Sequence, residues 1–451
     1  MKLKRLYHAS AFDPANPVES YWAASAPAIR HSAAELTGEV SCDVAVIGGG
    51  FTGLWTAYRL ERDYGMDVRV LDAAAPGWGA SGRNGGFCCV GSSKLPYSTM
   101  VRRYGRDAAQ EFVRTQWQAI DQVRGFLEET GTDAMTHSNG ELELAHRPKF
   151  IADLEADRRH KMEEFGEDCT FYDKAGLAEL GASGPEFHAG MVTKRGFALH
   201  PMRYARALAD AAASAGATLH GDSPVTSWTQ ANGRHVLKTP KGTVNAKHAV
   251  LATNGYSSEN LPDWMAGRAL PVMTSIVVTR PLTEDEKAAQ GWSCDLMSYD
   301  SRRLLHYFRL LPDNRFMFGG RGGIDASPEG RLATRGHLIA DFNRMYPAWK
   351  DVPIEYNWSG FVCLAADLVP YVGRIDTMEN AWTAFAYHGN GVAMASWSGA
   401  TLAGLIAGNT DVENAVPAMI RTPPRRFPLP WLRLAYLRAA YFGYKIQDEY
   451  L

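Results

Sequence analysis

Apolar positions in the first part of the chain fall into short blocks with two different periodicities. Residues 44–47 are apolar without interruption, which is typical of a parallel strand buried on both faces. Residues 54–60 have helical spacing, and residues 68–71 form a second strand-like block. A strand, a helix and a second strand within about 30 residues predict a βαβ unit with parallel strands.

The pattern after residue 90 predicts further helices and a long β-rich section. From 270 to 320 the sequence becomes strand-like, and the turn at 312–314 predicts a hairpin between the last two strands. The predicted helices are 112–127, a stretch from Pro201, 331–345 and 391–407. The predicted strands are 141–145, 247–253, 272–279, 304–311, 315–318, 356–363 and 382–387. Because α/β and β-rich segments interleave, we expect one domain to be inserted into another.

Three glycines lie where the first strand meets the first helix. Gly48 allows a tight turn, Gly50 lets the backbone approach a pyrophosphate, and Gly53 lets helix and strand pack closely, as in the G-x-G-x-x-G pattern. The helix N-terminus then directs its N–H groups at the phosphates. Asp72, at the end of the second strand, is placed for a ribose hydroxyl. This order predicts dinucleotide binding, against the alternative of an ordinary glycine-rich turn.

Composition and charge narrow the class of protein. At 451 residues the chain exceeds one usual domain, and a net charge of −2 predicts no general attraction to nucleic acid. No apolar run reaches the roughly 18–20 residues of a membrane span, and the basic start at 1–5 is not followed by the apolar core of a signal peptide. The 6 cysteines form no C-x-x-C pair, which favours reduced thiols in a cytoplasm. No cluster has the spacing of a metal site.

A long glycine-rich loop at 76–86 discriminates between dinucleotides. The G-x-G-x-x-G pattern occurs once, whereas an enzyme that reduces its flavin with a nicotinamide often has two such folds. Small residues around Trp78, Arg83 and Asn84 let the backbone approach a flat ring system. The loop therefore favours a flavin over a transferable nicotinamide, and the alternative is a plain surface turn.

Several sequence blocks, in a fixed order, carry a resemblance to a known family. The most specific block is Gly77-Trp-Gly-Ala-Ser-Gly-Arg-Asn-Gly-Gly86. The others are 20–22, 42–54, 199–201, 251–255, 318–321 and 387–392. On these blocks the chain resembles, over nearly its whole length, the D-amino-acid oxidase superfamily of FAD-dependent amine oxidoreductases. It is most similar to the gamma-glutamylputrescine oxidase group of that superfamily.

The resemblance implies an α/β fold in which a Rossmann-like FAD-binding domain is assembled from discontinuous segments. The inserted substrate domain would be a mixed antiparallel sheet with helices. The FAD-binding segments would be 40–90, 190–265 and 350–420, and the substrate domain would be 91–189 and 266–349. Residues 1–39 would wrap the surface, and residues 421–451 would form a basic, aromatic C-terminal tail.

FAD is the implied cofactor, with its ADP half on the βαβ unit and its ring between the two domains. Asp72 would hold the adenosine ribose, and Val225 would contact the adenine side through its backbone. Residues 389–392 would place N–H groups near the carbonyl edge of the flavin, where reduction puts negative charge. The implied cofactor-binding residues are Gly48, Gly50, Phe51, Thr52, Gly53, Asp72, Ala73, Trp78, Gly79, Ala80, Ser81, Arg83, Asn84, Gly85, Gly86, Val225, Thr253, Asn254, Gly255, Gly389, Asn390, Gly391 and Val392.

The implied reaction is hydride transfer to the flavin from the carbon next to an unprotonated amine. The resulting imine is hydrolysed by water to a carbonyl. Such chemistry depends on positioning more than on a catalytic base. The candidate substrate contacts are His306, Tyr307, Arg309, Arg321 and His388. Strand alternation puts His306 on one face and Tyr307 and Arg309 on the other, so they cannot all point into the site.

Each candidate also has a structural alternative. Arg321 either binds a substrate carboxylate through two parallel hydrogen bonds or pairs with an aspartate. His388 precedes a glycine-rich turn, where functional side chains collect, but a buried, hydrogen-bonded histidine fits the sequence equally well. His200 precedes the helix from Pro201 and is expected to cap that helix rather than to act in catalysis.

Two positions depart from the family pattern. Some relatives attach FAD through a cysteine, but alignment on Asp367 and Gly373 puts that position nearer Gly360 than Cys363, so we predict non-covalent FAD. The family often has Gly-His-Gly-Val before its last helix, where this chain has Gly389-Asn-Gly-Val392. This difference weakens the roles that the resemblance gives to His388 and Asn390.

Residues 421–451 combine basic side chains with aromatic and leucine residues, and no acid appears before Asp448. An amphipathic helix of this kind can lie on an anionic membrane. Docking onto the protein's own body or onto a second subunit is the favoured interpretation, because such tails usually need burial.

The sequence therefore predicts an enzyme: an FAD-dependent oxidase or dehydrogenase acting on a small amine or amino acid. The substrate would be a polyamine conjugate, an N-alkyl amino acid or a free amino acid. The electron acceptor would be oxygen, or alternatively a quinone or an electron-transfer protein. A flavin monooxygenase that uses a nicotinamide and a flavin-containing partner subunit are the other interpretations.

Overall fold

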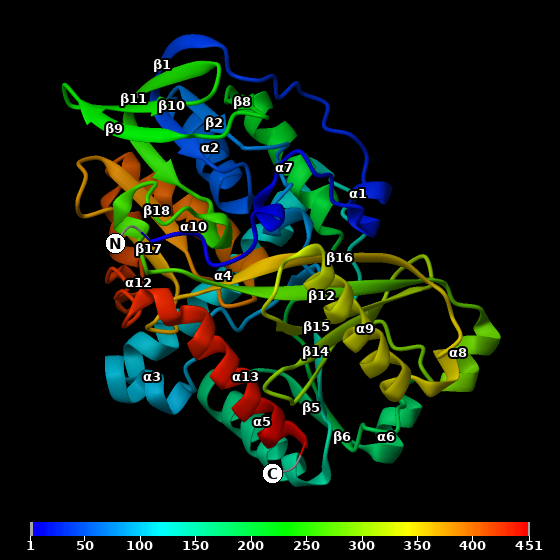
Figure 1. Cartoon of the computed structure of the whole chain (residues 1–451). Helices are drawn as coiled ribbons and strands as arrows, with labels where there is room; N and C mark the ends of the chain where they lie inside the picture. Colours follow the sequence, from blue (N-terminus) through cyan, green and yellow to red (C-terminus); the bar gives the residue numbers. More distant parts are fainter. Residues whose placement is uncertain (1–2, 450–451) are drawn as a thin grey trace.

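The computed structural model describes residues 3–449 and contains two large sheets that lie one above the other in Figure 1. The central strand of the first sheet is β1 (Gly38–Ile47), which pairs in parallel with β2 (Val68–Leu71) and β11 (Gly242–Leu251). The sheet order is β17-β18-β11-β1-β2-β8. Its other strands are β8 (Thr218–His220), β9 (Ser227–Ala231), β10 (Arg234–Lys238), β17 (Tyr371–Arg374) and β18 (Ala381–Phe385).

Three helices cover one face of this sheet because each has a broad apolar surface. They are α2 (Phe51–Tyr64), α7 (Pro201–Ala215) and α10 (Gly391–Ile406), and α4 (Arg106–Thr130) packs behind them. The buried residues Val44, Val46, Val68 and Val70 point from the strands into this helical layer. Ala45, Ile47 and Leu71 point to the opposite face, where they pack with Trp228 and Leu237 of the β9–β10 hairpin. A parallel sheet buried on both faces is what the uninterrupted apolar run at 44–47 predicts.

The second sheet is mixed, with the order β16-β12-β15-β14-β13-β4-β6-β5. Its strands are β4 (Glu141–Ala145), β5 (Cys169–Asp173), β6 (Ala189–Thr193), β12 (Leu270–Pro281), β13 (Met297–Asp300), β14 (His306–Leu310), β15 (Arg315–Gly323) and β16 (Ile354–Leu364). Helix α9 (Pro328–Met345) covers one face through Leu338, Phe342 and Met345, which pack on Phe308 and Phe318. The predicted hairpin at 304–318 is confirmed as β14 and β15.

The remaining elements are short or lie on the surface. The other helices are α1 (Tyr21–Ser25), α3 (Tyr97–Tyr104), α5 (Ile151–Phe165), α6 (Lys174–Glu179), α8 (Glu284–Gln290), α11 (Thr410–Ala415), α12 (Ala418–Arg421) and α13 (Arg433–Glu449). A small separate sheet is formed by β3 (Phe87–Cys88) and β7 (Phe197–Ala198). Among the described residues, none of the helices is long and apolar enough to cross a membrane.

One predicted domain boundary needs correction. The sequence predicts that residues 350–420 belong to the FAD-binding domain, but β16 lies in the second sheet, where it pairs with β12 from Leu270–Leu364 to Thr279–Ile354. Strand β6 also belongs to the second sheet, although the predicted FAD-binding segment begins at residue 190. The return to the first sheet therefore begins after Leu364. The apolar pattern identifies a strand but does not identify the distant strand that pairs with it.

The C-terminal helix α13 packs against the chain's own body, as Figure 1 shows in red. Leu437 is buried against Leu270 and Val272, whereas Tyr436 and Phe442 are exposed at 39% and 71%. The inner face of this helix thus docks onto the protein itself, as the favoured prediction states. Membrane or partner contact through its exposed aromatic face stays a prediction.

Candidate active site

The turn between β1 and α2 forms the floor of a cavity between the two sheets. Gly48 has a φ of +108°, and a Cβ there would lie 2.9 Å from the carbonyl oxygen of Ala252. A Cβ on Gly53 would collide with the carbonyl oxygen of Gly48. Both positions therefore require glycine, for the tight turn and for close packing of helix on strand.

Asp72 lies half-buried at the end of β2 and is held by backbone donors. Its two carboxylate oxygens accept hydrogen bonds from the N–H groups of Gly49, at 2.6 Å, and Ala74, at 2.9 Å. Burial raises the pKa of this carboxyl group, and the two backbone donors oppose that shift. Asp72 is thus a fixed acceptor at one end of the cavity, beside the first glycine turn.

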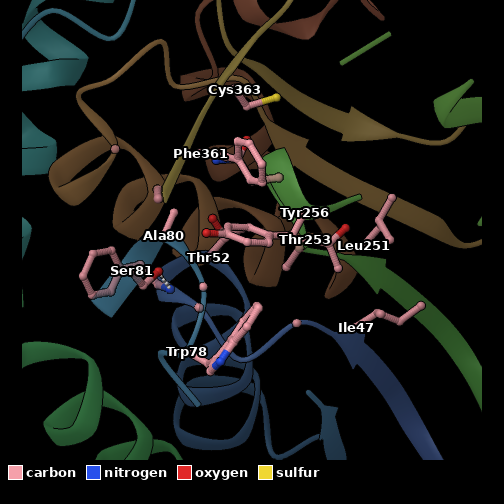
Figure 2. A pocket seen from close by; sticks show the side chains of 18 of the residues that line it. Ile47, Thr52, Trp78, Ala80, Ser81, Leu251, Thr253, Tyr256, Phe361 and Cys363 are labelled. Carbon is pink, nitrogen blue, oxygen red and sulfur yellow. Dashed lines mark hydrogen bonds between the residues drawn. The ribbon is translucent and has the colours of Figure 1, made fainter. Parts of the chain in front are cut away.

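The cavity is lined from both sheets and from the glycine-rich loop, as Figure 2 shows. Ile47 and Leu251 come from the first sheet, Trp78 and Ser81 from the loop, and Phe361 from β16. The N-termini of α2 and α10 both meet the cavity, which gives it two positively polarised helix ends. The predicted cofactor residues that line it are Gly48, Gly50, Phe51, Thr52, Asp72, Ala73, Trp78, Gly79, Ala80, Ser81, Asn84, Val225, Thr253, Asn254, Gly389, Gly391 and Val392.

Other predicted cofactor residues lie behind this wall and support it. The Arg83 guanidinium stacks on the ring of Trp78 at 4.1 Å and donates to the carbonyl of Ser359 at 3.3 Å. Asn390 donates to the carbonyl of Val90 at 2.6 Å, so its side chain holds the loop that precedes α10. The predicted residues outside the cavity wall are Gly53, Arg83, Gly85, Gly86, Gly255 and Asn390.

His388 lines the cavity in a strained and unpaired state. Its φ is +55°, its side chain is fully buried, and neither ring nitrogen has a hydrogen-bond partner among the described residues. Burial lowers the pKa of the imidazole well below its usual value, and the positive charges of Lys94 and Arg321 act in the same direction. The alternative of a buried, hydrogen-bonded histidine is therefore wrong within the described chain. A neutral ring with two unsatisfied nitrogens fits a ligand-binding position.

His306 is not brought to this cavity, and its prediction as a substrate contact needs correction. It lies on the α9 face of the second sheet, where Nδ1 is 2.9 Å from Asp300 and Nε2 is 3.3 Å from Asp341. Burial alone would lower the pKa of His306, but the two carboxylates outweigh it and raise the pKa to about 9. His306 is thus the centre of a buried ion-pair network.

Tyr307 and Arg309 lie on the opposite face of β14, as strand alternation predicts. The guanidinium of Arg309 donates to the carbonyls of Gly85, at 3.1 Å, and Leu199, at 2.8 Å, so this side chain braces the glycine-rich loop. Tyr307 packs against the same loop, and its hydroxyl is 2.8 Å from that of Thr274. Neither residue lines the cavity described above. His200 caps α7 by accepting from the N–H of Arg203 at 3.2 Å, as expected.

Arg321, near the end of β15, reaches the loop that enters α10. A Cβ on Gly389 would lie 3.0 Å from its Nη2 atom, and Gly389 lines the cavity. The Arg321 backbone pairs with β12 opposite Thr274, but its side chain has no hydrogen bond or ion pair with another described residue. The predicted alternative, a structural pair with an aspartate, is therefore wrong for the described part of the chain. An unpaired guanidinium at the edge of a cavity is available to an anionic group.

An aromatic wall that the sequence does not predict lies over the cavity. Tyr256 and Phe361 pack edge to face at 5.4 Å between ring centroids, and Phe12 stacks on Phe361 at 5.2 Å. All three line the cavity, together with Arg5 from the N-terminal segment. These residues come from three segments that lie far apart in the sequence; Arg5 and Tyr256, which are joined by a hydrogen bond, are 251 positions apart. No short motif could have connected them.

Comparison with known proteins identifies the class of protein that this fold and cavity define. Residues 43–405 match the family described as FAD dependent oxidoreductase (DAO), so the chain belongs to that family and is an enzyme that uses FAD. The structure fits the cofactor: a glycine turn, the Asp72 carboxylate, two helix N-termini and the unpaired His388 surround one cavity.

Particular relatives refine this placement. Gamma-glutamylputrescine oxidoreductase of Escherichia coli (strain K12) is 30% identical over 396 residues, which are 87% of this chain and 89% of the relative. Glycine oxidase of Bacillus licheniformis is 26% identical, over 81% of this chain and 93% of the relative. The crystal structure of glycine oxidase from Geobacillus kaustophilus has the same fold, with a TM-score of 0.67 and 22% identity over 81% of this chain and 95% of that one.

Proposed function

We propose that this FAD-dependent oxidoreductase oxidises the C–N bond of a small amine or amino acid to an imine, which water hydrolyses to a carbonyl. The observation that carries the proposal is an FAD-type cavity that has the unpaired imidazole of His388 in its wall and the Arg321 guanidinium beside Gly389 at its edge. A purely structural site would satisfy these polar groups internally.

FAD, when bound, supplies the two-electron acceptor for a hydride from the carbon next to the amine nitrogen. The chain's own residues position the reactants. The N-terminus of α10, from Gly391, directs N–H groups into the cavity, where they stabilise negative charge as it develops. Neutral His388 offers a nitrogen acceptor that does not repel a cationic amine. The aromatic wall of Tyr256 and Phe361 keeps the cavity apolar and limits water.

The relatives' names support the choice of substrate class. One relative is named for gamma-glutamylputrescine and another for glycine. Each of these two compounds is a small molecule that carries both an amine and a carboxylate. We therefore propose a polyamine conjugate, an N-alkyl amino acid or a free amino acid as the substrate. Oxygen is the proposed acceptor, and a quinone or an electron-transfer protein is the alternative. We also propose a cytoplasmic location, because all 6 cysteines of the chain are free and buried.

Product analysis tests the proposal. Holoenzyme is incubated with a panel of polyamine conjugates, N-methyl amino acids and D- and L-amino acids, in air and with an artificial acceptor. We expect at least one member to yield a carbonyl product and ammonia or an amine in equal amounts. A panel in which no member yields a carbonyl with either acceptor would contradict the proposal.

A further inference from the structure

Exposed apolar side chains gather near the C-terminal end of the chain. Of the eight large apolar side chains that are exposed among the described residues, six lie between residues 429 and 444. They are Leu429, Trp431, Leu432, Tyr436, Phe442 and Tyr444, and the other two are Met162 and Leu332. Single exposed apolar residues are ordinary, whereas their concentration on one segment marks a contact surface.

The outer face of α13 carries much of this surface. Tyr436, Ala439 and Phe442 follow one another at a spacing of three residues on the helix, and all three are exposed. Trp431, directly before the helix, is 54% exposed. Leu437 lies on the other face, where it packs against the second sheet. The helix therefore has an apolar side toward the protein and a second apolar side toward solvent.

Contacts at both ends hold this helix in place. At the N-terminal end, the buried Arg433 donates to Glu259 at 2.6 Å. At the C-terminal end, Asp448 accepts from the N–H groups of Arg303, at 2.9 Å, and Leu304, at 3.1 Å. A surface that is already ordered loses little conformational freedom when it binds a partner. The outer face of α13 is thus presented in one fixed orientation.

Basic residues accompany the apolar ones. Residues 421–447 contain six basic side chains and no acidic one, although the whole chain has a net charge of −2. Arg425 and Arg433 are paired with acids from other parts of the chain. Arg426 and Arg438 are exposed and have no ion pair with another described residue. Part of the positive charge is therefore available to an anionic partner.

A bilayer with anionic headgroups matches both properties of this segment. Tryptophan and tyrosine rings favour the boundary between lipid and water, and arginine beside them attracts anionic lipids. A second copy of the chain fits less well, because a two-fold contact through this face would bring two sets of basic residues together. Contact with one membrane surface does not require a helix that crosses the bilayer.

We propose that the outer face of α13 docks the protein onto anionic membranes. Trp431 and Phe442 would enter the headgroup region, and Arg426 and Arg438 would face the lipid phosphates. The contact uses a part of the chain beyond residues 43–405, which match the family. It does not depend on the proposed oxidation of amines.

Flotation of the holoenzyme with lipid vesicles tests this contact. Vesicles of phosphatidylcholine alone are compared with vesicles that also contain phosphatidylglycerol, at low and at high salt. We expect flotation with the anionic vesicles, weaker flotation at high salt, and little with phosphatidylcholine alone. The double variant Arg426→Gln with Arg438→Gln should lower the partition coefficient on anionic vesicles about 10- to 30-fold. Lys238→Gln with Lys350→Gln removes two other exposed charges and should float as the wild type does.

A second pair of variants tests the apolar part of the contact. Trp431→Ala with Phe442→Ala should lower the partition coefficient on anionic vesicles about tenfold or more. Met162→Ala with Leu332→Ala is the matched control, because these are the exposed large apolar residues outside the segment. It should float as the wild type does. Circular dichroism and FAD content show that each variant is folded.

Two kinds of result would overturn the inference. The first is no flotation with anionic vesicles, equal flotation with both kinds of vesicle, or control variants that float as poorly as the α13 variants. The second is a dimer in sedimentation velocity without lipid that Trp431→Ala with Phe442→Ala dissociates, which would assign this face to a second copy of the chain. If the holoenzyme floats as expected but no amine is oxidised, the proposed function fails while the membrane contact stands.

Discussion

Asp72 tests the cofactor site at the level of one carboxylate. Its oxygens line the cavity beside the Gly48 turn, and a charged acceptor contributes about 1.5–3 kcal/mol to a hydrogen bond. Asp72→Asn should therefore raise the Kd of FAD about 10- to 100-fold, measured by flavin fluorescence on reconstitution of apoenzyme. The exposed Asp222 contributes a charge next to Asp72, so Asp222→Asn is the matched control and should bind FAD as the wild type does. Equal Kd values for both variants would remove Asp72 from the site.

His306 makes a prediction about stability rather than activity. Its pKa is raised to about 9 in the folded protein, against about 6.5 when unfolded, so its ion pairs stabilise the fold fully below pH 6.5. This stabilisation, about 3 kcal/mol at most, is lost as the pH rises from 6.5 through 9. Denaturant unfolding of wild type and His306→Gln should show a difference in unfolding free energy that shrinks over this range. A difference independent of pH would mean that His306 is neutral in the folded protein.

Cys363 tests the mode of cofactor attachment. It lies in the cavity wall, but burial raises the pKa of its thiol to about 12, so the nucleophilic thiolate is absent at neutral pH. Acid precipitation of the holoenzyme should release the yellow colour into the supernatant. Cys363→Ala should keep its FAD content through gel filtration. Yellow colour that stays on the precipitated wild type would contradict non-covalent binding.

Residue type and spacing alone predict many of the side chains that line the cavity, but they do not predict which polar residues of the second sheet lie near it. Gly48, Asp72 and Ser81 belong to contiguous motifs whose local geometry follows from the sequence. His306 and Arg321 are both polar residues on predicted strands, and their roles depend on which face meets which domain. Their different surroundings become visible only in the structure, through the register of β14 with β15 and the contacts of His306 with Asp300 and Asp341.

At the scale of elements, α13 is stabilised by a buried ion pair that tests its docking. Arg433 is fully buried, and Glu259 is 9% exposed. Arg433→Met leaves the Glu259 carboxylate buried without its partner, which typically costs about 3–5 kcal/mol. The double variant Arg433→Met with Glu259→Gln should recover much of that loss in denaturant unfolding. If the single variant unfolds as the wild type does, α13 is not docked in solution as the structure describes.

Local patterns predict most elements, because they depend on nearby residues. The strand, turn and helix at 44–60 and the hairpin of β14 and β15 both follow from apolar periodicity and turn chemistry. The partner of β16 does not follow from local patterns, because the pairing of β16 with β12 joins segments about 80 residues apart. The sequence also does not determine which face of α13 docks onto the protein, because both faces carry aromatic residues.

In the molecule as a whole, residues of both sheets line one cavity, which the glycine turn of β1 and His388 both meet, and Arg321 lies beside Gly389 at its edge. The part of the cavity wall that comes from the first sheet and the glycine-rich loop consists of short motifs, whereas Tyr256, Phe361 and His388 come from distant segments. This difference explains why the sequence indicates FAD more directly than the substrate.

Anaerobic reduction of the flavin tests the central claim most directly. Holoenzyme is mixed without oxygen with each amine of the panel, and separately with NADPH, while the absorbance of oxidised flavin is followed. We expect that at least one amine of the panel bleaches the flavin by itself and that NADPH alone does not. Bleaching by NADPH alone, or by none of the amines, would contradict the proposed amine oxidation.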